Sequence, residues 1–230
     1  MQRDNFDKQF TDVRYKLVNC DTDSIMISHE DDSLMSEEER DSIVEKVNSL
    51  FTDNIRWEDD GYFERVICIK IKNYVLYDGK NIKCKGSAIK DPKKEPALKE
   101  FINRLIDCLL FDKTNYKEIY AEYVNEIMNL KDIMRWSVRK TLTENVLNAK
   151  RTNEQKILDS IEGTEYKEGD RFHVFYKEDG RMCLSSKFDG NYDKKRMLKK
   201  LYLTGKIFET LLPTETIFPN YSLIRNYKHL

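Results

Sequence analysis

The sequence is poor in the residues that build covalent staples, metal clusters and flexible linkers. Its 230 residues include five Cys, eight Gly, four Pro and three His, and no two cysteines form a CxxC pair. A zinc site and a disulfide framework are therefore not predicted, and the scattered thiols are typical of a reducing, cytoplasmic compartment. No apolar run approaches the length of a membrane span, so no membrane partner is expected.

Several catalytic arrangements are also missing. His29, His173 and His229 are isolated, and no Ser or Cys has a recognisable base partner. Hydrolase chemistry by an activated nucleophile therefore has little support. There is also no Gly-rich loop of the kind that surrounds a phosphate.

Charge is distributed unevenly along a chain whose formal net charge is only −1. Residues 1–60 hold 17 acidic and 7 basic side chains, a balance of −10. Residues 65–99 hold 10 basic and 3 acidic side chains, a balance of +7. This order suits a site that binds metal ions beside a polyanion, although an ordinary mixed surface would also produce it.

The first hundred residues predict an α+β layer of antiparallel strands with one helix packed on a face. The expected strands are residues 15–19, 24–28, 63–77 and 81–85. The sequence Asp78-Gly79 is a hairpin-turn signal between the last two. Ser36 and Glu39 form a capping box, and apolar residues at helical spacing follow, so residues 36–52 should be an amphipathic helix.

The pattern changes at residues 91–96, which we interpret as a domain boundary. The domains expected on this basis are residues 1–96 and 97–230. The second is expected to be mainly helical, because the apolar spacing predicts helices. They lie at residues 97–111, 115–130, 144–160 and 193–212, with a strand at 171–177.

The sharpest chemical feature is Asp21-Thr22-Asp23-Ser24, which lies between the first two expected strands. Two carboxylates at a hairpin tip offer the hard oxygen ligands that Mg²⁺ prefers. Two such ions about 3.5–4 Å apart catalyse phosphoryl transfer in many enzymes. A polar turn without chemistry has the same composition, and sugar-nucleotide transferases also bind a metal through a DxD sequence.

The wider string, Tyr15-Lys16-Leu17-Val18-Asn19-Cys20-Asp21-Thr22-Asp23-Ser24-Ile25, resembles motif C of family B DNA polymerases, commonly YGDTDS between β-strands. Asn19 and Cys20 replace the usual Tyr and Gly. The resemblance implies that Asp23 is the firm metal ligand and Asp21 a weaker or indirect contributor. It also implies two Mg²⁺ ions as cofactors.

Two further resemblances occur downstream, in the order that the family has. Phe63-Glu64-Arg65-Val66 is similar to the family's FEKVY-like strand, and Lys72-Asn73-Tyr74 is similar to its KxY motif. Lys85-Gly86 resembles the KG on the return strand. The resemblance implies that this hairpin grips primer–template DNA, with Lys72 at a phosphate or a minor-groove edge and Tyr74 packed beside it.

The second half has a weaker resemblance to the thumb of the same enzymes. Trp136 to Leu142 resembles a thumb strand with an SKxL pattern, and Glu168-Gly169-Asp170-Arg171-Phe172 resembles a GDR turn. The family's fold implies a partial palm sheet over residues 1–96 and a thumb over 97–230. It also implies DNA contacts at Arg139 and Lys140.

The 230 residues contain no DxxSLYPS-like motif A and no KxxxNSxYG-like motif B. We therefore expect the C-terminal part of a DNA polymerase, as one half of a split viral or phage enzyme in the cytoplasm of its host. The implied partners are primer–template DNA, deoxynucleoside triphosphates and a second chain carrying exonuclease, fingers and motif A. A non-catalytic DNA-binding remnant is the alternative. A DxD glycosyltransferase ranks lower, because 20 residues before the motif cannot supply its nucleotide-sugar domain.

Overall fold

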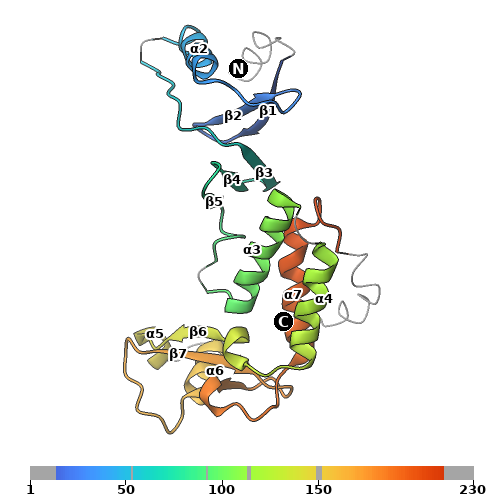
Figure 1. The fold of residues 1–230 in the computed structure, drawn as a ribbon. Helices are drawn as coiled ribbons and strands as arrows, with labels where there is room; N and C mark the ends of the chain where they lie inside the picture. The colour runs from blue at the N-terminus through green and yellow to red at the C-terminus, as the bar shows by residue number, and fades with distance from the viewer. Residues whose placement is uncertain (1–13, 53, 92, 113–114, 149–151, 215–230) are drawn as a thin grey trace. The chain divides into compact units, whose positions relative to one another are not determined.

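The computed structural model describes residues 14–52, 54–91, 93–112, 115–148 and 152–214. The chain forms two compact units, unit 1 (Met1–Gly86) and unit 2 (Ser87–Leu230). Each contains helices and antiparallel strands (Figure 1), which agrees with the expected α+β class. The assignment of residues 1–96 to a palm and 97–230 to a thumb stays a prediction.

The first element of unit 1 is the predicted β-hairpin. Strands β1 (Tyr15–Cys20) and β2 (Ile25–His29) pair antiparallel, with a bulge in β1 between Leu17 and Asn19. Helix α2 (Glu37–Asn48) comes next, and the Ser36 hydroxyl accepts the Glu39 backbone N–H at 3.2 Å. The capping interaction predicted from these two residue types is therefore present, and the helix ends four residues earlier than residue 52.

Unit 1 also contains a three-stranded antiparallel sheet of order β3-β4-β5. Its strands are β3 (Arg65–Lys70), β4 (Asn73–Tyr77) and β5 (Ile82–Lys85). The prediction of one continuous strand over residues 63–77 is wrong, because the chain turns at Ile71 and Lys72. Lys72 adopts a left-handed backbone conformation with φ of 60°. Lysine rarely does so, and the run of β-forming residues on both sides conceals the turn.

Unit 2 is built around helices α3 (Pro96–Phe111), α4 (Tyr116–Met128) and α7 (Lys194–Gly205), which lie side by side (Figure 1). Their shared core is aromatic, and Phe101, Tyr120 and Tyr202 are almost completely buried. Gly205 is required at the contact between α4 and α7, because a Cβ there would collide with the Tyr120 hydroxyl. Helix α7 continues into the short η3 (Lys206–Phe208), so the predicted helix over 193–212 is too long.

The remainder of unit 2 is a second three-stranded antiparallel sheet, which makes the prediction of a mainly helical second half incomplete. Its strands, in order, are β6 (Val138–Thr141), β7 (Arg171–Tyr176) and β8 (Met182–Leu184). Short helices α5 (Glu144–Leu147) and α6 (Thr152–Ser160) replace the single helix predicted over 144–160, since Asn148 leaves helical geometry. Residues 149–151 of that prediction lie outside the described residues.

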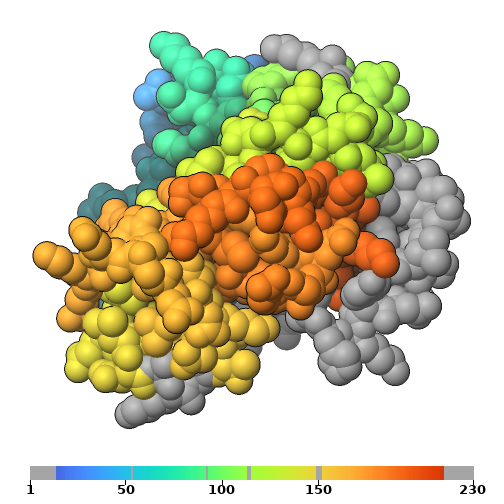
Figure 2. All heavy atoms as spheres, turned by 90° about the horizontal axis from the view of Figure 1, so that it is seen from below, coloured from blue at the N-terminus to red at the C-terminus, as the bar shows by residue number. Residues whose placement is uncertain are grey.

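The second sheet has its own apolar core, to which α5 contributes Val146, α6 contributes Ile157 and the turn after α6 contributes Ile161. Short helices η1 (Ile133–Trp136) and η2 (Ser185–Lys187) lead into β6 and out of β8. The residues coloured yellow to orange form a closely packed surface of unit 2 in the space-filling view (Figure 2). In the described part of the chain, none of the helices has the length and apolar character needed to cross a bilayer.

Candidate functional site

The two aspartates predicted as metal ligands lie in the tight connection between β1 and β2. The Asp21 backbone N–H donates to the Ser24 carbonyl oxygen at 2.9 Å, and the Thr22 N–H donates to Asp21 Oδ1 at 2.9 Å. Because residues 21–24 form a turn, the alternation of side chains along an extended strand does not apply to them. Asp21 is half-buried and Asp23 is exposed, so the two carboxylates have different surroundings.

Asp21 is paired with the lysine of the KxY motif. Lys72 Nζ lies 3.4 Å from Asp21 Oδ1, and the Lys72 and Asp21 side chains are 68% and 31% exposed. The hydrogen bond from the Thr22 backbone N–H lowers the pKa of Asp21, and the Lys72 ammonium lowers it further, while partial burial opposes both. The structure thus brings together two motifs that the sequence separates by about fifty residues.

Asp23 has the open carboxylate of the pair. Among the described residues, no hydrogen bond or ion pair engages its side chain, and it is exposed at the hairpin tip. Its oxygens fit the preference of Mg²⁺ for hard ligands, and this ion keeps several waters when few carboxylates bind it. Over the described part of the chain, no group of three or more His, Cys, Asp or Glu side chains is placed to hold a metal.

The KxY hairpin presents its motif residues through the turn and the central strand. Lys72 occupies the turn between β3 and β4, and Tyr74 on β4 pairs with Cys68 on β3 and Lys85 on β5. Directly paired residues project from the same face of a sheet. Tyr74 and Lys85 therefore share one face, and the exposed Lys72 lies at the end of the same hairpin.

Two glycines allow close approaches that fix this hairpin. Gly86 has φ of +103°, and a Cβ there would collide with the Lys72 carbonyl oxygen and the Asn73 side chain. A Cβ at Gly79 would collide with the carboxylate of Glu64. Gly86 and Glu64 thus have structural functions here: Gly86 packs against the Lys72 turn, and Glu64 covers the turn between β4 and β5.

A side-chain network that the sequence did not reveal fastens α2 to the hairpin. Glu39 Oε1 accepts the Tyr15 hydroxyl at 2.5 Å and lies 2.8 Å from His29 Nε2. His29 Nδ1 lies 2.7 Å from the Ser33 hydroxyl. The Glu39 carboxylate raises the pKa of His29, chiefly through the hydrogen bond between Glu39 Oε1 and His29 Nε2. Tyr15 and His29 are cross-strand partners, so one helical carboxylate holds both strands.

The predicted DNA-binding pair in unit 2 is divided between two faces of β6. Arg139 is exposed, whereas its neighbour Lys140 is half-buried and lines a pocket with Val138 and Lys200. Successive strand residues point to opposite faces, so the structure does not place Arg139 and Lys140 in one cluster. The nearby Arg135 is also not part of a cationic cluster with them, because its guanidinium forms ion pairs with two carboxylates. Arg135 Nε donates to Glu126 Oε1 and Arg135 Nη1 donates to Glu100 Oε2, both at 2.9 Å.

Comparison with known proteins agrees with the sequence motifs. The family model "DNA polymerase family B" matches residues 2–197. A search of curated proteins found no match. Among solved structures, the family B DNA polymerase from the hyperthermophilic archaeon Pyrobaculum calidifontis is similar, with a TM-score of 0.62 and 18% sequence identity.

That likeness is one of fold, and it covers 92% of this chain but 28% of the archaeal polymerase. The chain therefore spans somewhat more than a quarter of that enzyme's length. The match to the family model covers most of the sequence and includes the Asp21–Asp23 turn and the KxY hairpin. On this evidence, the chain belongs to DNA polymerase family B.

Proposed function

We propose that this chain is the C-terminal part of a DNA-directed DNA polymerase and supplies motif C and the primer grip for nucleotidyl transfer. The observation that carries the proposal is the ion pair between Asp21 and Lys72, 3.4 Å between Oδ1 and Nζ. It joins the predicted metal-binding turn to the predicted DNA-binding hairpin.

The two aspartates take different roles in this proposal. Asp23, exposed and without a described partner, holds the metal. Asp21 is a positioning residue, because Lys72 and the Thr22 N–H already engage its carboxylate. Bound Mg²⁺ would supply charge neutralisation of the triphosphate and activation of the attacking oxygen. The Lys72 side chain is 68% exposed, so its ammonium can contact DNA while it remains paired with Asp21.

The hairpin around Lys72 supports a grip on the DNA backbone. Lys70, Lys72, Lys83 and Lys85 are all exposed on strands β3 to β5 or on their turn. Cations on adjacent strands bind phosphates without reading bases, which a polymerase requires because it must accept any sequence. Tyr74 shares a face with Lys85 and would pack beside the strand that these lysines hold.

Polypeptide outside the 230 residues completes the site in this proposal. In the described part, the buried hydrophobic residues of unit 1 are Val47, Ile69, Val75 and Leu76. Leu17 on β1 and Ile71 in the hairpin turn are 44% and 87% exposed. A two-stranded sheet is marginal by itself. We therefore propose that a polymerase segment with motif A, fingers and exonuclease packs against it, on a second chain as the sequence predicts.

The test is primer extension by the assembled polymerase. The chain is purified with its partners from the native source, and incorporation into a labelled primer is measured with Mg²⁺. Asp23→Ala should reduce the rate by about 10³-fold or more, since it removes a metal ligand whose charge stabilisation amounts to several kcal/mol. Primer–template affinity should change less than about twofold.

Asp60→Asn is the matched control, because Asp60 is an exposed carboxylate of unit 1 outside the hairpin tip. It should leave the extension rate unchanged. Recovery of the chain without a polymerase partner, together with DNA binding that Asp23→Ala does not alter, would contradict the catalytic role. That result would favour the non-catalytic DNA-binding remnant.

A further inference from the structure

Unit 2 contains a strongly basic pocket that neither motif C nor the KxY hairpin explains. Its volume is about 400 Å³, and it lies among β6, β7, α7 and the segment that begins α3. Its charged lining residues are the cationic Lys93, Lys94, Lys140, Arg196 and Lys200 and the acidic Asp91 and Glu95. The excess of positive charge is therefore three.

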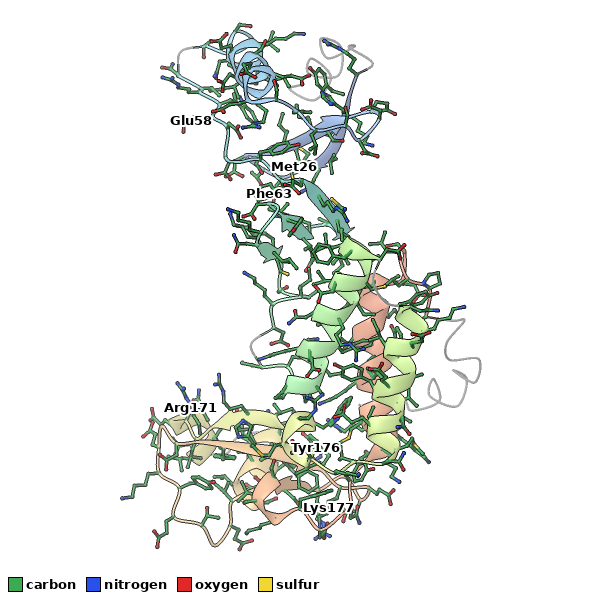
Figure 3. All side chains as sticks on the ribbon, viewed as in Figure 1. Met26, Glu58, Phe63, Arg171, Tyr176 and Lys177 are labelled. Atoms are coloured by element: carbon green, nitrogen blue, oxygen red, sulfur yellow. The ribbon has the colours of Figure 1, made fainter. Side chains whose placement is uncertain are left out.

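The fold collects these cations from distant parts of the sequence. Lys140 faces the pocket from β6, and Arg196 and Lys200 lie four residues apart on one face of α7. Tyr176 is the last residue of β7, and it lies at the end of that strand that is nearer the helices (Figure 3). The Arg196 guanidinium carbon lies 3.6 Å from the centre of the Tyr176 ring. Stacking on this ring holds the guanidinium against the pocket wall.

The two acidic residues offset only part of this positive charge. Glu95 is buried and forms an ion pair with Lys200. The Asp91 carboxylate accepts the Lys93 backbone N–H at 2.8 Å. Burial lowers the pKa of Lys140, and the nearby cations Lys200 and Lys93 lower it further. The remaining ammonium and guanidinium groups therefore repel one another in a partly desolvated space.

The pocket also contains one buried hydrogen-bond donor without an acceptor and one helix N-terminus without a side-chain cap. Arg196 Nε is buried and has no hydrogen-bond partner within the described residues. Helix α3 begins at the pocket, and Glu95 at its N-cap forms no side-chain cap hydrogen bond. A buried donor without an acceptor is costly, and the first turn of a helix favours an anion. These observations are independent of the lysine cluster, and they also favour a negatively charged ligand.

We propose that this pocket binds a phosphate group. A phosphate carries up to two negative charges and several acceptor oxygens, enough to engage Lys93, Lys140 and Arg196 together. The apolar lining residues Leu98, Val138 and Leu203 reduce water access and strengthen such contacts. The phosphate belongs either to a free polyphosphate or to a nucleic-acid strand, and the chemistry of recognition is shared.

The test is a calorimetric titration of the 230-residue chain with inorganic pyrophosphate in the absence of divalent cations. One pyrophosphate should bind per chain. Lys140→Gln should weaken binding about tenfold or more, the effect of losing roughly 1.4 kcal/mol of charge–charge attraction. Lys93→Gln should act in the same direction, and because Lys93 is exposed, the substitution should not disturb folding.

Arg171→Gln is the matched control, because it removes one positive charge from β7 at the end away from Tyr176 (Figure 3). Its effect on binding should be less than twofold. Absence of pyrophosphate binding would overturn the proposal, and so would equal weakening by Arg171→Gln, which would show a diffuse charge effect. Asp23→Ala should leave pyrophosphate binding unchanged, so this test is separate from that of the polymerase function.

Competition identifies the source of the phosphate. Short single-stranded oligonucleotides with a 5′-hydroxyl or a 5′-phosphate are titrated against bound pyrophosphate. Competition by both supports the pocket as a site for strand phosphates, whereas competition by the 5′-phosphorylated form alone supports a site for terminal phosphate. If neither displaces pyrophosphate, the site is one for free polyphosphate.

Discussion

At the scale of single residues, the surroundings of Asp21 determine how firmly its carboxylate holds a proton. The Thr22 N–H and the Lys72 ammonium both stabilise the charged form, so the pKa lies below the ordinary value of 3.8. A carboxyl with a depressed folded-state pKa contributes stability above its unfolded pKa. That contribution is lost as pH falls through the folded pKa.

We predict that Lys72→Gln raises the pKa of Asp21 only part of the way to its ordinary value. The Thr22 N–H is the larger cause of the shift and remains in place. Carbon-13 NMR titration of the Asp21 carboxyl measures the change. Lys83→Gln removes a lysine of the same sheet and serves as the control, with no change expected. A pKa of Asp21 that is equal in Lys72→Gln and the unmodified chain would show that the ion pair is absent in solution.

Gly86→Ala tests the close approach behind the Lys72 turn. Its positive φ alone costs an alanine roughly 1–2 kcal/mol, and the collision with the Lys72 carbonyl adds to this. We expect a loss of at least about 2 kcal/mol in unit 1, measured by hydrogen exchange of the β4 amides. Gly61 also has a positive φ but has no atom within 3.4 Å of an added Cβ. Gly61→Ala should therefore cost less, and equal losses would contradict the role of Gly86.

Individual residues also show where prediction from sequence ends. Asp21 to Ser24 were identified because a polar turn between two β-forming runs has a local signature. The partner of Asp21 was not, because Lys72 approaches from another hairpin and no local pattern records that contact. The resemblance of residues 136–142 to a thumb strand likewise implied DNA contacts at both Arg139 and Lys140, whereas the strand places their side chains on opposite faces.

At the scale of elements, Glu39 fastens α2 to both strands of the β1–β2 hairpin through Tyr15 and His29. His29 has a raised pKa, so the folded state binds its proton more tightly than the unfolded state. This contribution to stability is complete below the ordinary pKa of 6.5 and is lost as pH rises through the folded pKa. The pKa of Glu39 is lowered from its ordinary value of 4.5, chiefly by the hydrogen bond from the Tyr15 hydroxyl. The Glu39 carboxylate therefore stays charged, and its interaction with His29 persists, to a pH below 4.5.

We predict that His29→Gln destabilises unit 1 most between about pH 5 and pH 6.5 and progressively less above that range. Hydrogen exchange of the α2 amides is measured in the variant and in the unmodified protein from about pH 5 to pH 9, with correction for the intrinsic exchange rate. The comparison gives the loss of stability at each pH. Ser28→Ala changes the neighbouring strand residue without touching Glu39 and is the control. A difference that grows with pH would contradict the assigned interaction.

Elements were predicted well where a strong period or a capping residue marked them, as in α2, α3 and the β1–β2 hairpin. Prediction failed where an element's end depends on backbone conformation. Lys72 breaks the expected strand through a positive φ that lysine seldom adopts. Strand β8 was missed because three residues are too few to show a period.

At the scale of the whole molecule, the buried core is unequally shared between the two units. Unit 2 holds the aromatic core of Phe101, Tyr120, Tyr123 and Tyr202, while unit 1 buries few large side chains among its described residues. Core size sets how much conformational entropy folding can offset. The two units should therefore differ in stability when they are separated.

We predict that a fragment of residues 87–230 folds alone with a cooperative thermal transition. A fragment of residues 1–86 should melt at a lower temperature or without cooperativity. Circular dichroism of each fragment measures this, and the intact chain provides the reference. A stable 1–86 fragment would show that unit 1 does not depend on additional polypeptide to cover its exposed hydrophobic residues.

The bulge in β1 has a consequence for how the lengths of related chains can vary. The backbone at Val18 lies between the paired residues Leu17 and Asn19, and its carbonyl accepts the Cys68 thiol at 3.8 Å. A strand can lose a bulged residue and return to regular pairing without moving the residues downstream. Relatives with one residue fewer here should therefore keep the aspartate turn in place and lose only the contact with Cys68. Residues 21–24 contain no extra residue of this kind, because the Asp21 N–H and the Ser24 carbonyl close a tight turn. Alignments of related sequences should therefore show a gap at Val18 and none in the turn.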